Sequence, residues 1–396
     1  MREEGSAMAE KPVPNGNTPR DADDVRQTLV ALNLVHGDRG LICALAQRLR
    51  AAAELRSDRF AEEAASSLEA PLDRVRTIVL AARGRLDDAR AEMARASEDG
   101  VDIVTLFDPE YPPALADLGL QAPPVLYVRG RLSPAPGISI VGSRKADAYG
   151  LEVAAWFARR LAAAGLVVIS GFARGIDQAA HRSALAARAG TGRTVAVLGC
   201  GIDVDYPRRS RRTAAGIARQ GCLITEFPLG WQPRAHHFPI RNRLIAALGF
   251  ASLVVRAARR SGSLITARLA LDLGRDVYAV PGSVLSRESA GAHLLLRDGA
   301  IPALDPDAML ETLPTSILAQ LECPPSDTAE PTRSAATGVS EVDDLLVALR
   351  EGARTPEELA SQLQRPVPGV LATLARLEVD GLVRRYEGAN YALMAR

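Results

Sequence analysis

Ile140-Val-Gly-Ser-Arg144 is the first of four short stretches that place Gly, Ser or Arg where a hydrophobic strand ends and a helix begins. The others are Ile169-Ser-Gly-Phe-Ala-Arg-Gly-Ile-Asp177, Phe238-Pro-Ile-Arg-Asn-Arg243 and Ser261-Gly-Ser-Leu-Ile-Thr-Ala267. At such a junction free backbone N–H groups and the helix dipole favour an anion, and a small residue lets a phosphate approach closely. One junction indicates a nucleotide. Four on one rim, several with Arg, indicate a tract for several phosphates in a row, as a nucleic-acid strand presents them.

The middle of the chain alternates between short apolar strands and helical stretches. A helix is expected over Leu151–Ala164, ended by Gly165. Alternation at this pitch predicts βαβ units, and therefore an α/β fold with a doubly wound parallel sheet of the Rossmann type. The ligand crevice of such a sheet lies beyond the carboxyl ends of its strands. The strand candidates are 138–141, 166–170, 194–198, 222–226, 251–255 and 277–280, preceded by 101–106 and 125–130.

The two ends of the chain have different patterns. Apolar residues at helix spacing predict a small helical bundle over 24–97, after a disordered tail of residues 1–23. The sheet domain is expected over 98–313, and the Pro-, Ser- and Thr-rich residues 314–338 are typical of a linker.

Residues 339–396 predict a winged helix. Thr355-Pro-Glu-Glu358 is a capping box at a helix start, and 382–386 with 391–393 form a hairpin. Arg376 is the single basic residue of the presumed recognition helix. This favours a protein contact or weak DNA binding over sequence-specific recognition of DNA.

The basic residues are unevenly distributed along the 396-residue chain, whose formal net charge is +1. Between Gly199 and Arg268 there are twelve Arg, no Lys and three acidic residues, which indicates a phosphate-bearing partner. A GC-rich genome offers another explanation, because it favours Arg over Lys. That bias does not explain the excess of basic over acidic residues.

The cysteines and the N-terminus indicate the compartment. The four cysteines show no C-x-x-C spacing, so we expect reduced, buried thiols and no metal site. The first twenty residues are polar, and no apolar run is long enough for a membrane helix. A cytoplasmic protein with no membrane partner is expected.

Several single residues have a structural reading beside the functional one. Asp177 and His181, one helical turn apart, fit acid–base or metal chemistry, but more often such a pair braces a helix. His236 and His237 are solvated or stacking residues rather than ligands. Phe238 is either a core residue or a stacking platform beside the Arg241-Asn242-Arg243 group.

Pro207-Arg-Arg-Ser-Arg-Arg212 concentrates four positive charges where a helix begins, opposite to what the helix dipole prefers. A bound anion offsets that cost; a solvated charge cluster is the alternative. No G-x-x-x-x-G-K-[ST] loop and no G-x-S-x-G elbow occur, so neither an ATP-driven motor nor a serine hydrolase is expected.

Together these stretches resemble the bacterial DNA-processing protein A family, also called Smf, from about residue 25 to the end. The resemblance rests on Val141-Gly-Ser-Arg144, Ser170-Gly-Phe-Ala-Arg-Gly-Ile-Asp177, Thr225-Glu-Phe-Pro228, Phe238-Pro-Ile-Arg-Asn-Arg243 and Ser261-Gly-Ser-Leu-Ile-Thr-Ala267, in the family's order. It implies an extended Rossmann domain between a sterile-alpha-motif-like bundle and a winged helix.

The resemblance also implies a function. A family member binds incoming single-stranded DNA during natural transformation, protects it, and loads the RecA recombinase on it while displacing single-strand-binding protein. It acts as a homodimer, is not an enzyme and needs no cofactor. Arg144, Arg241 and Arg243 are expected to contribute most to binding. The expected DNA-binding residues are Gly142, Ser143, Arg144, Gly171, Arg174, Phe238, Arg241, Asn242, Arg243, Ser261, Gly262, Ser263 and Thr266.

Two positions depart from the family pattern. Arg256 stands where an acidic residue is usual and is expected to strengthen phosphate binding, and His293 stands where Asn is usual. The competing hypothesis is a nucleotide hydrolase of the phosphoribohydrolase-like Rossmann class. No carboxylate follows the Arg260-Ser-Gly-Ser-Leu-Ile-Thr266 loop within the next turn, which favours the DNA binder. A third hypothesis is a protein-interaction hub in which the bundle and the winged helix carry the function.

Overall fold

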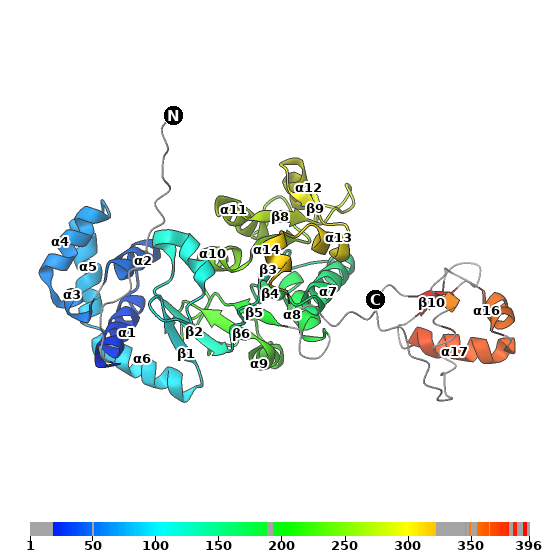
Figure 1. Cartoon of the computed structure of the whole chain (residues 1–396), viewed down its shortest axis with the longest axis horizontal. Coiled ribbons are helices and arrows are strands. Elements are labelled where there is room, and N and C mark those ends of the chain that lie inside the picture. Colours follow the sequence, from blue (N-terminus) through cyan, green and yellow to red (C-terminus); the bar gives the residue numbers. More distant parts are fainter. Residues whose placement is uncertain are drawn as a thin grey trace. The chain divides into compact units, whose positions relative to one another are not determined.

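The computed structural model of the chain describes residues 19–49, 51–187, 193–321, 345, 348–349, 355–363, 365–379, 383–385 and 391–393. The chain divides into two compact units, Met1–Pro324 and Pro325–Arg396 (Figure 1). Cys323, residues 1–18 of the predicted tail and residues 322–338 of the predicted linker lie outside the described residues.

A nine-stranded sheet forms the centre of the first unit, and its strands run in the order β1-β2-β6-β5-β4-β3-β7-β8-β9. Neighbours from β6 to β9 pair in parallel, whereas β2 is antiparallel to both β1 and β6. The strands are β1 (Asp102–Thr105), β2 (Val125–Gly130), β3 (Gly137–Val141), β4 (Val167–Ser170), β5 (Thr194–Val197), β6 (Cys222–Thr225), β7 (Ala251–Val254), β8 (Asp276–Ala279) and β9 (Ile301–Pro302). The predicted α/β fold class is confirmed, and every predicted strand of the first unit is present within a residue or two.

Helices cover both faces of the sheet. Successive strand residues point to opposite sides, so each strand contributes to both layers of the core. Ile138 and Ile140 of β3 pack with α7 (Ala148–Ala163) and α8 (Ile176–Leu185). Val141, at the end of the same strand, packs instead with α10 (His237–Leu248) and α11 (Ser263–Asp272). Further helices of this part are η1 (Pro113–Gln121), α9 (Arg211–Gln220), α12 (Ala290–Arg297), α13 (Pro306–Glu311) and α14 (Thr315–Leu318).

The helical bundle packs directly on the sheet rather than standing apart from it. Leu29, Leu32 and Leu45 of the bundle are fully buried and share one hydrophobic cluster with Tyr127 of β2. Figure 1 shows the bundle next to β1 and β2. Its helices are α1 (Pro19–Asn33), α2 (Arg39–Arg48), α3 (Ala52–Arg56), α4 (Asp58–Ser67), α5 (Leu72–Arg83) and α6 (Leu86–Glu98).

The sheet has one topological switch point. From β3 the strand order runs to β4, β5 and β6 on one side and to β7, β8 and β9 on the other. Crossover helices therefore leave β3 and β7 toward opposite faces, and a crevice opens beyond the carboxyl ends of these two strands.

Two expected boundaries fall differently in the structure. Helix α7 starts three residues before the predicted Leu151, because the Asp147 side chain accepts a hydrogen bond from Gly150 N–H and caps it. Helix α14 (Thr315–Leu318) lies inside the segment predicted as a linker, and Ile317 packs against the core. The domain limits themselves stay a prediction.

The second unit contains α16 (Pro356–Gln362), α17 (Val367–Val379), and a hairpin of β10 (Val383–Arg385) and β11 (Tyr391–Leu393). The predicted capping box is present: Glu358 N–H donates to Thr355 Oγ1 at 3.2 Å, and Thr355 N–H donates to Glu358 Oε2 at 2.9 Å. The predicted winged helix is confirmed. Across both units, no helix in the described part of the chain is long and apolar enough to span a bilayer.

Candidate nucleic-acid interface

A crevice of about 660 Å³ lies at the switch point of the sheet. Its size is that of a typical ligand site. It is lined by most of the residues expected from the sequence, which come from four separate loops and helix starts. These are Gly142, Ser143, Arg144, Phe238, Arg241, Asn242, Ser261, Gly262, Ser263 and Thr266.

The turn after β3 is held in place by Arg256, two residues after the end of β7. Ser143 N–H donates to Arg256 O at 2.7 Å. A side chain at Gly142 would place its Cβ 2.6 Å from Ile176 Cγ1, so glycine is required for this close packing. Arg144, two residues after Gly142, is exposed at the mouth of the crevice.

Arg144 and Phe238 form the most distinctive contact of the crevice. The Arg144 guanidinium carbon lies 4.6 Å from the centroid of the Phe238 ring, a cation–π geometry that orients both groups. The ring also packs closely against Gly199, since a Cβ at that position would lie 2.9 Å from Phe238 Cδ1. A flat guanidinium on an aromatic ring offers a surface on which a nucleobase can stack.

Arg241 lies beneath this pair. Its side chain is 2% exposed, and Nη1 donates to the carbonyl oxygen of Val197, while Nε has no hydrogen-bond partner in the described part of the chain. Burial lowers the pKa of Arg241 to about 10, so it remains charged at neutral pH. It therefore supplies positive charge from the floor of the crevice.

Gly171 is explained by Arg241 rather than by a ligand. A Cβ at position 171 would lie 2.7 Å from Arg241 Cζ. The predicted residue thus makes room for the guanidinium and is not part of the crevice lining. Arg174, on the same loop, is exposed and also lies outside the lining.

Arg243, predicted to bind DNA, is not part of the crevice lining, because its side chain points away from the crevice. Residues two apart on a helix lie on different faces, so Arg241 and Arg243 cannot share one. Arg243 Nη2 lies 2.9 Å from Glu226 Oε2, Nη1 pairs with Glu226 Oε1, and Nε donates to Gln121 O at 3.0 Å. The side chain of Arg243 is a buried structural group.

The structure does not favour the expectation that Arg256 strengthens phosphate binding, because protein groups occupy its side chain. Its guanidinium is 4% exposed and pairs with both carboxylate oxygens of Asp147. It also donates to Ser289 Oγ and lies 5.2 Å from the Tyr149 ring centroid. His293 lies nearby, with Nε2 3.0 Å from Gly282 O. The Arg256 side chain therefore stabilises the turn before α7 by binding Asp147.

Small residues surround the start of α11 at one side of the crevice. Ser261 Oγ and Ser263 Oγ are 2.7 Å apart, and Asn242 Nδ2 donates to Gly262 O at 3.3 Å. Ser261 Oγ also accepts a hydrogen bond from Ser263 N–H at 3.3 Å, and no described atom lies within 4 Å of the position that a Gly262 Cβ would take. The open space and the helix dipole therefore leave room for an anion at this helix start.

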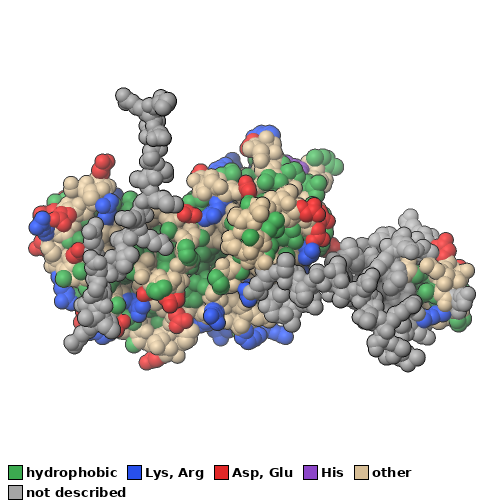
Figure 2. Space-filling model, viewed as in Figure 1, with side chains coloured by type: hydrophobic (Ala, Val, Ile, Leu, Met, Phe, Trp, Pro, Cys, Tyr) green, Lys and Arg blue, Asp and Glu red, His purple; other side chains and the backbone are tan. Residues whose placement is uncertain are grey.

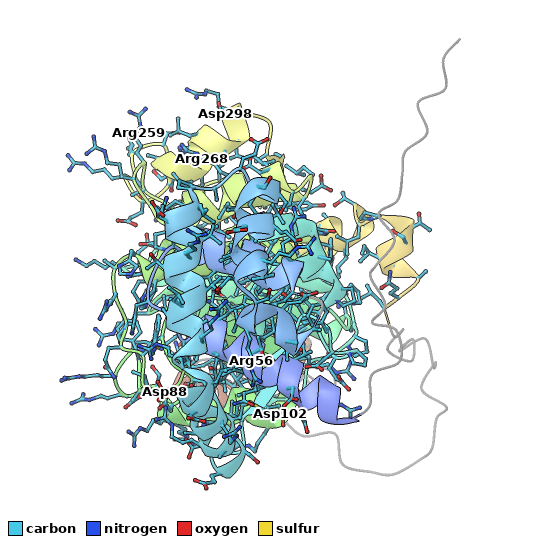
Figure 3. The ribbon with its side chains drawn as sticks, turned by 90° about the vertical axis from the view of Figure 1, so that its left-hand side faces the viewer. Arg56, Asp88, Asp102, Arg259, Arg268 and Asp298 are labelled. Atoms are coloured by element: carbon cyan, nitrogen blue, oxygen red, sulfur yellow. The ribbon has the colours of Figure 1, made fainter. Side chains whose placement is uncertain are left out.

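Four charged residues of the lining are not among the expected DNA-binding residues. Lys145 and Arg260 add positive charge to the mouth, and both are exposed. Both could have been predicted, because Lys145 follows Arg144 and Arg260 precedes Ser261 in the sequence. Glu288 and Asp177 add carboxylates to the lining. Glu288 lies on the loop after β8, where no local sequence motif predicts it. Figure 3 shows that Arg259 and Arg268 project outward at one edge of the molecule, near α11.

His181 and His237 have structural contacts. His181 is fully buried, its Nδ1 lies 2.7 Å from Thr194 Oγ1, and burial lowers its pKa to about 3, so it is neutral. His237 stacks on Phe227 with ring centroids 4.3 Å apart. The helix-bracing interpretation of His181 therefore fits its geometry better than acid–base chemistry does. Cys43, Cys200 and Cys222 are buried free thiols.

Comparison with known proteins agrees with this architecture. Residues 102–314 match the family model described as DNA recombination-mediator protein A. This chain belongs to that family. Residues 329–389 match a second model, the DprA winged helix domain.

Similarity to individual members of the family extends over most of the chain. It is 37% identical over 286 residues to Protein Smf of Escherichia coli strain K12, covering 72% of this chain and 75% of that protein. It is 40% identical over 198 residues to DNA processing protein DprA of Streptococcus pneumoniae, covering 50% and 68%. The X-ray structure of DNA processing protein A from Streptococcus pneumoniae superposes with a TM-score of 0.56 at 30% identity, covering 66% of this chain and 96% of that one.

Proposed function

We propose that this chain is a recombination mediator that binds single-stranded DNA in the crevice and presents it to a recombinase, without a chemical step of its own. The observation that carries the proposal is the Arg144–Phe238 stack, which lies in the same crevice as the sterically open start of α11. The stack suits a base, and the helix start suits the phosphate next to it.

A single strand fits this crevice better than a duplex does. In a duplex the bases are stacked on each other and paired, so their faces are not available to a protein side chain. A single strand exposes those faces while keeping its phosphates within reach of Arg144, Lys145 and Arg260. Binding of this kind depends little on base sequence.

The proposed partners follow from the family. A recombination mediator acts on the recombinase that coats single-stranded DNA, so RecA is the proposed protein partner and single-strand-binding protein the one displaced. We place this activity in the cytoplasm and in a homodimer. The winged helix contributes a protein contact or weak DNA binding, because Arg376 is the single basic residue of its presumed recognition helix.

Fluorescence anisotropy with a labelled oligothymidine across a salt series tests DNA binding. Wild type should bind the single strand more tightly than duplex competitor, and Arg144→Ala should weaken binding. Arg159→Ala, an exposed arginine on α7, is the matched control and should bind as wild type does. Equal binding by wild type and Arg144→Ala would overturn the assignment of the crevice.

Glu288 favours a second candidate function, nucleotide hydrolysis. Its Oε2 is buried without a hydrogen-bond partner among the described residues, and the side chain lines the crevice together with Asp177. Burial raises the pKa of Asp177, as a general acid requires. Release of free base from nucleoside monophosphates by wild type, abolished in Glu288→Gln, would support the enzyme; no release would leave the DNA binder.

A further inference from the structure

The segment after β5 carries four exposed arginines that the crevice does not use. Arg208, Arg209, Arg211 and Arg212 are exposed, whereas Pro207 and Ser210 between them are buried and anchor the segment. Arg211 Nε lies 3.3 Å from Asp205 Oδ2, and the other three have no ion pair with a carboxylate in the described ranges. Figure 2 shows Lys and Arg side chains along the lower edge of this face, where Figure 1 draws α9.

This concentration of charge is unfavourable in the free protein. Helix α9 begins at Arg211, so its positive dipole end adds to the charge of the arginines. Ser210 at the N-cap does not cap the helix, because its Oγ instead accepts a hydrogen bond from Gln178 Nε2 at 2.8 Å. Arg209 has φ +70°, and Ser210 follows at φ −98° and ψ 0°. Left- and right-handed residues in succession direct neighbouring N–H groups to one side, which is an anion-binding arrangement.

The arginine segment is continuous with the crevice. Tyr206, two residues before Arg208, has its ring 5.5 Å from that of Phe238, centroid to centroid. A second connection runs through α8, which contacts Ser210 at Gln178 and the crevice at Ile176, whose N–H donates to Ser143 O at 3.3 Å. Exposed Arg174 lies on the loop just before α8. Strand β4 alone separates β5 from β3, so the loops begin about 10 Å apart.

We propose that Arg208, Arg209 and Arg212, with Arg174, form a second phosphate-binding segment that extends the crevice. A single DNA strand then runs from the Arg144–Phe238 stack past Tyr206 to the start of α9. This inference rests on the proposed function and adds to it the direction and length of the DNA path. The ligand is an extended polyanion rather than one free phosphate, because the arginines are exposed and spread along the rim.

The test compares oligothymidines of about 4 to about 16 nucleotides, the range over which single-strand sites of proteins vary. The variant Arg208→Gln/Arg209→Asn/Arg212→Gln removes three charges from exposed positions, and Asn suits the positive φ of position 209. The matched control is Arg59→Gln/Arg90→Gln/Arg297→Gln, which removes three exposed arginines on α4, α6 and α12.

For long oligomers, loss of three phosphate contacts should reduce the slope of log K against log salt concentration by about 2, since each contact on a single strand contributes about 0.7. The shortest oligomers that bind should be unaffected, and the control should match wild type at every length. Unchanged long-oligomer binding in the triple variant, with Arg144→Ala still defective, would overturn the extended path and leave the proposed function intact. Failure of wild type to bind any oligomer would instead overturn the proposed function.

Discussion

Arg243 on α10 and Glu226 after β6 form a buried ion pair, with Arg243 Nη2 2.9 Å from Glu226 Oε2. Arg39 of the helical bundle approaches the same carboxylate oxygen at 3.2 Å, and its Nη2 also donates to Asn33 Oδ1 at 2.7 Å. Glu226 is fully buried between the two guanidinium groups. The bundle, the sheet and the helix that carries Phe238 are therefore joined at one point.

Arg243→Ala should lower the free energy of unfolding by about 3–5 kcal/mol, because it leaves the buried Glu226 carboxylate short of its main partner. Urea unfolding followed by circular dichroism measures the change. Arg159→Ala, which removes an exposed arginine, should shift the free energy by less than about 0.5 kcal/mol. A folded Arg243→Ala protein of normal stability that fails to bind DNA would contradict the structural role assigned to Arg243.

The same ion pair predicts a loss of stability in acid. Burial raises the pKa of Glu226, but the charges and hydrogen bonds of Arg243 and Arg39 outweigh it and leave the pKa below its ordinary value. A lowered pKa means that the stabilisation is complete above about pH 4.3, the pKa in the unfolded chain, and is lost as pH falls toward the folded value. Unfolding free energies of wild type and Glu226→Gln should therefore differ most near pH 7 and converge only as the pH falls through the lowered pKa of the folded protein. A difference independent of pH would show that Glu226 does not titrate in this way.

Local patterns in the sequence predicted the sheet because buried parallel strands are continuous apolar runs. The two-residue strand β9 (Ile301–Pro302) escaped prediction, since so short a segment has no period. The start of α7 was placed late for a different reason. Asp147 was not recognised as its cap, and that side chain also pairs with Arg256, 109 residues further along the chain.

The position of a site residue could be predicted where the residue directly follows a strand. It could not be predicted where the side chain depends on a partner that is far away in the sequence. Gly142, Ser143 and Arg144 lie at the crevice as expected, because the end of β3 fixes their position. The ion pairs of Arg243 and Arg256 could not be predicted, because a motif gives the residue type but not the helix face or the carboxylate that the side chain meets. Glu226 and Asp147 supply those carboxylates from other elements.

Phe238 and Arg144 should contribute to DNA binding in different ways. Phe238→Ala removes a stacking surface, so it should weaken binding by about 1–3 kcal/mol while leaving the salt slope unchanged. Arg144→Gln removes one phosphate contact, so it should reduce the slope by about 0.7. Anisotropy titrations at several salt concentrations distinguish the two effects, and Phe238→Tyr should bind nearly as wild type does. A changed slope in Phe238→Ala would argue against stacking as its main role.

Gly171→Ala should affect binding indirectly through Arg241. The added Cβ would lie 2.7 Å from Arg241 Cζ, so the buried guanidinium must leave its place under the crevice. We expect a loss of stability of about 1–3 kcal/mol, as for other overpacked cores, together with weaker DNA binding. Thermal unfolding and anisotropy on the same preparation measure both. Normal stability with normal binding would show that Arg241 has space elsewhere.

Gly262→Ala separates binding from stability, because no atom of the described residues lies within 4 Å of the added methyl group. The backbone at Gly262 has φ −62° and ψ −23°, which alanine adopts freely, so the folded protein should be as stable as wild type or slightly more so. A phosphate at the start of α11 would meet that methyl group, and we expect DNA binding to weaken about tenfold. Gly274→Ala, at another open position but with φ +68°, should show the reverse, lower stability with unchanged binding. If Gly262→Ala binds DNA as wild type does, no phosphate approaches the start of α11, and the strand must lie closer to Arg144 and Lys145.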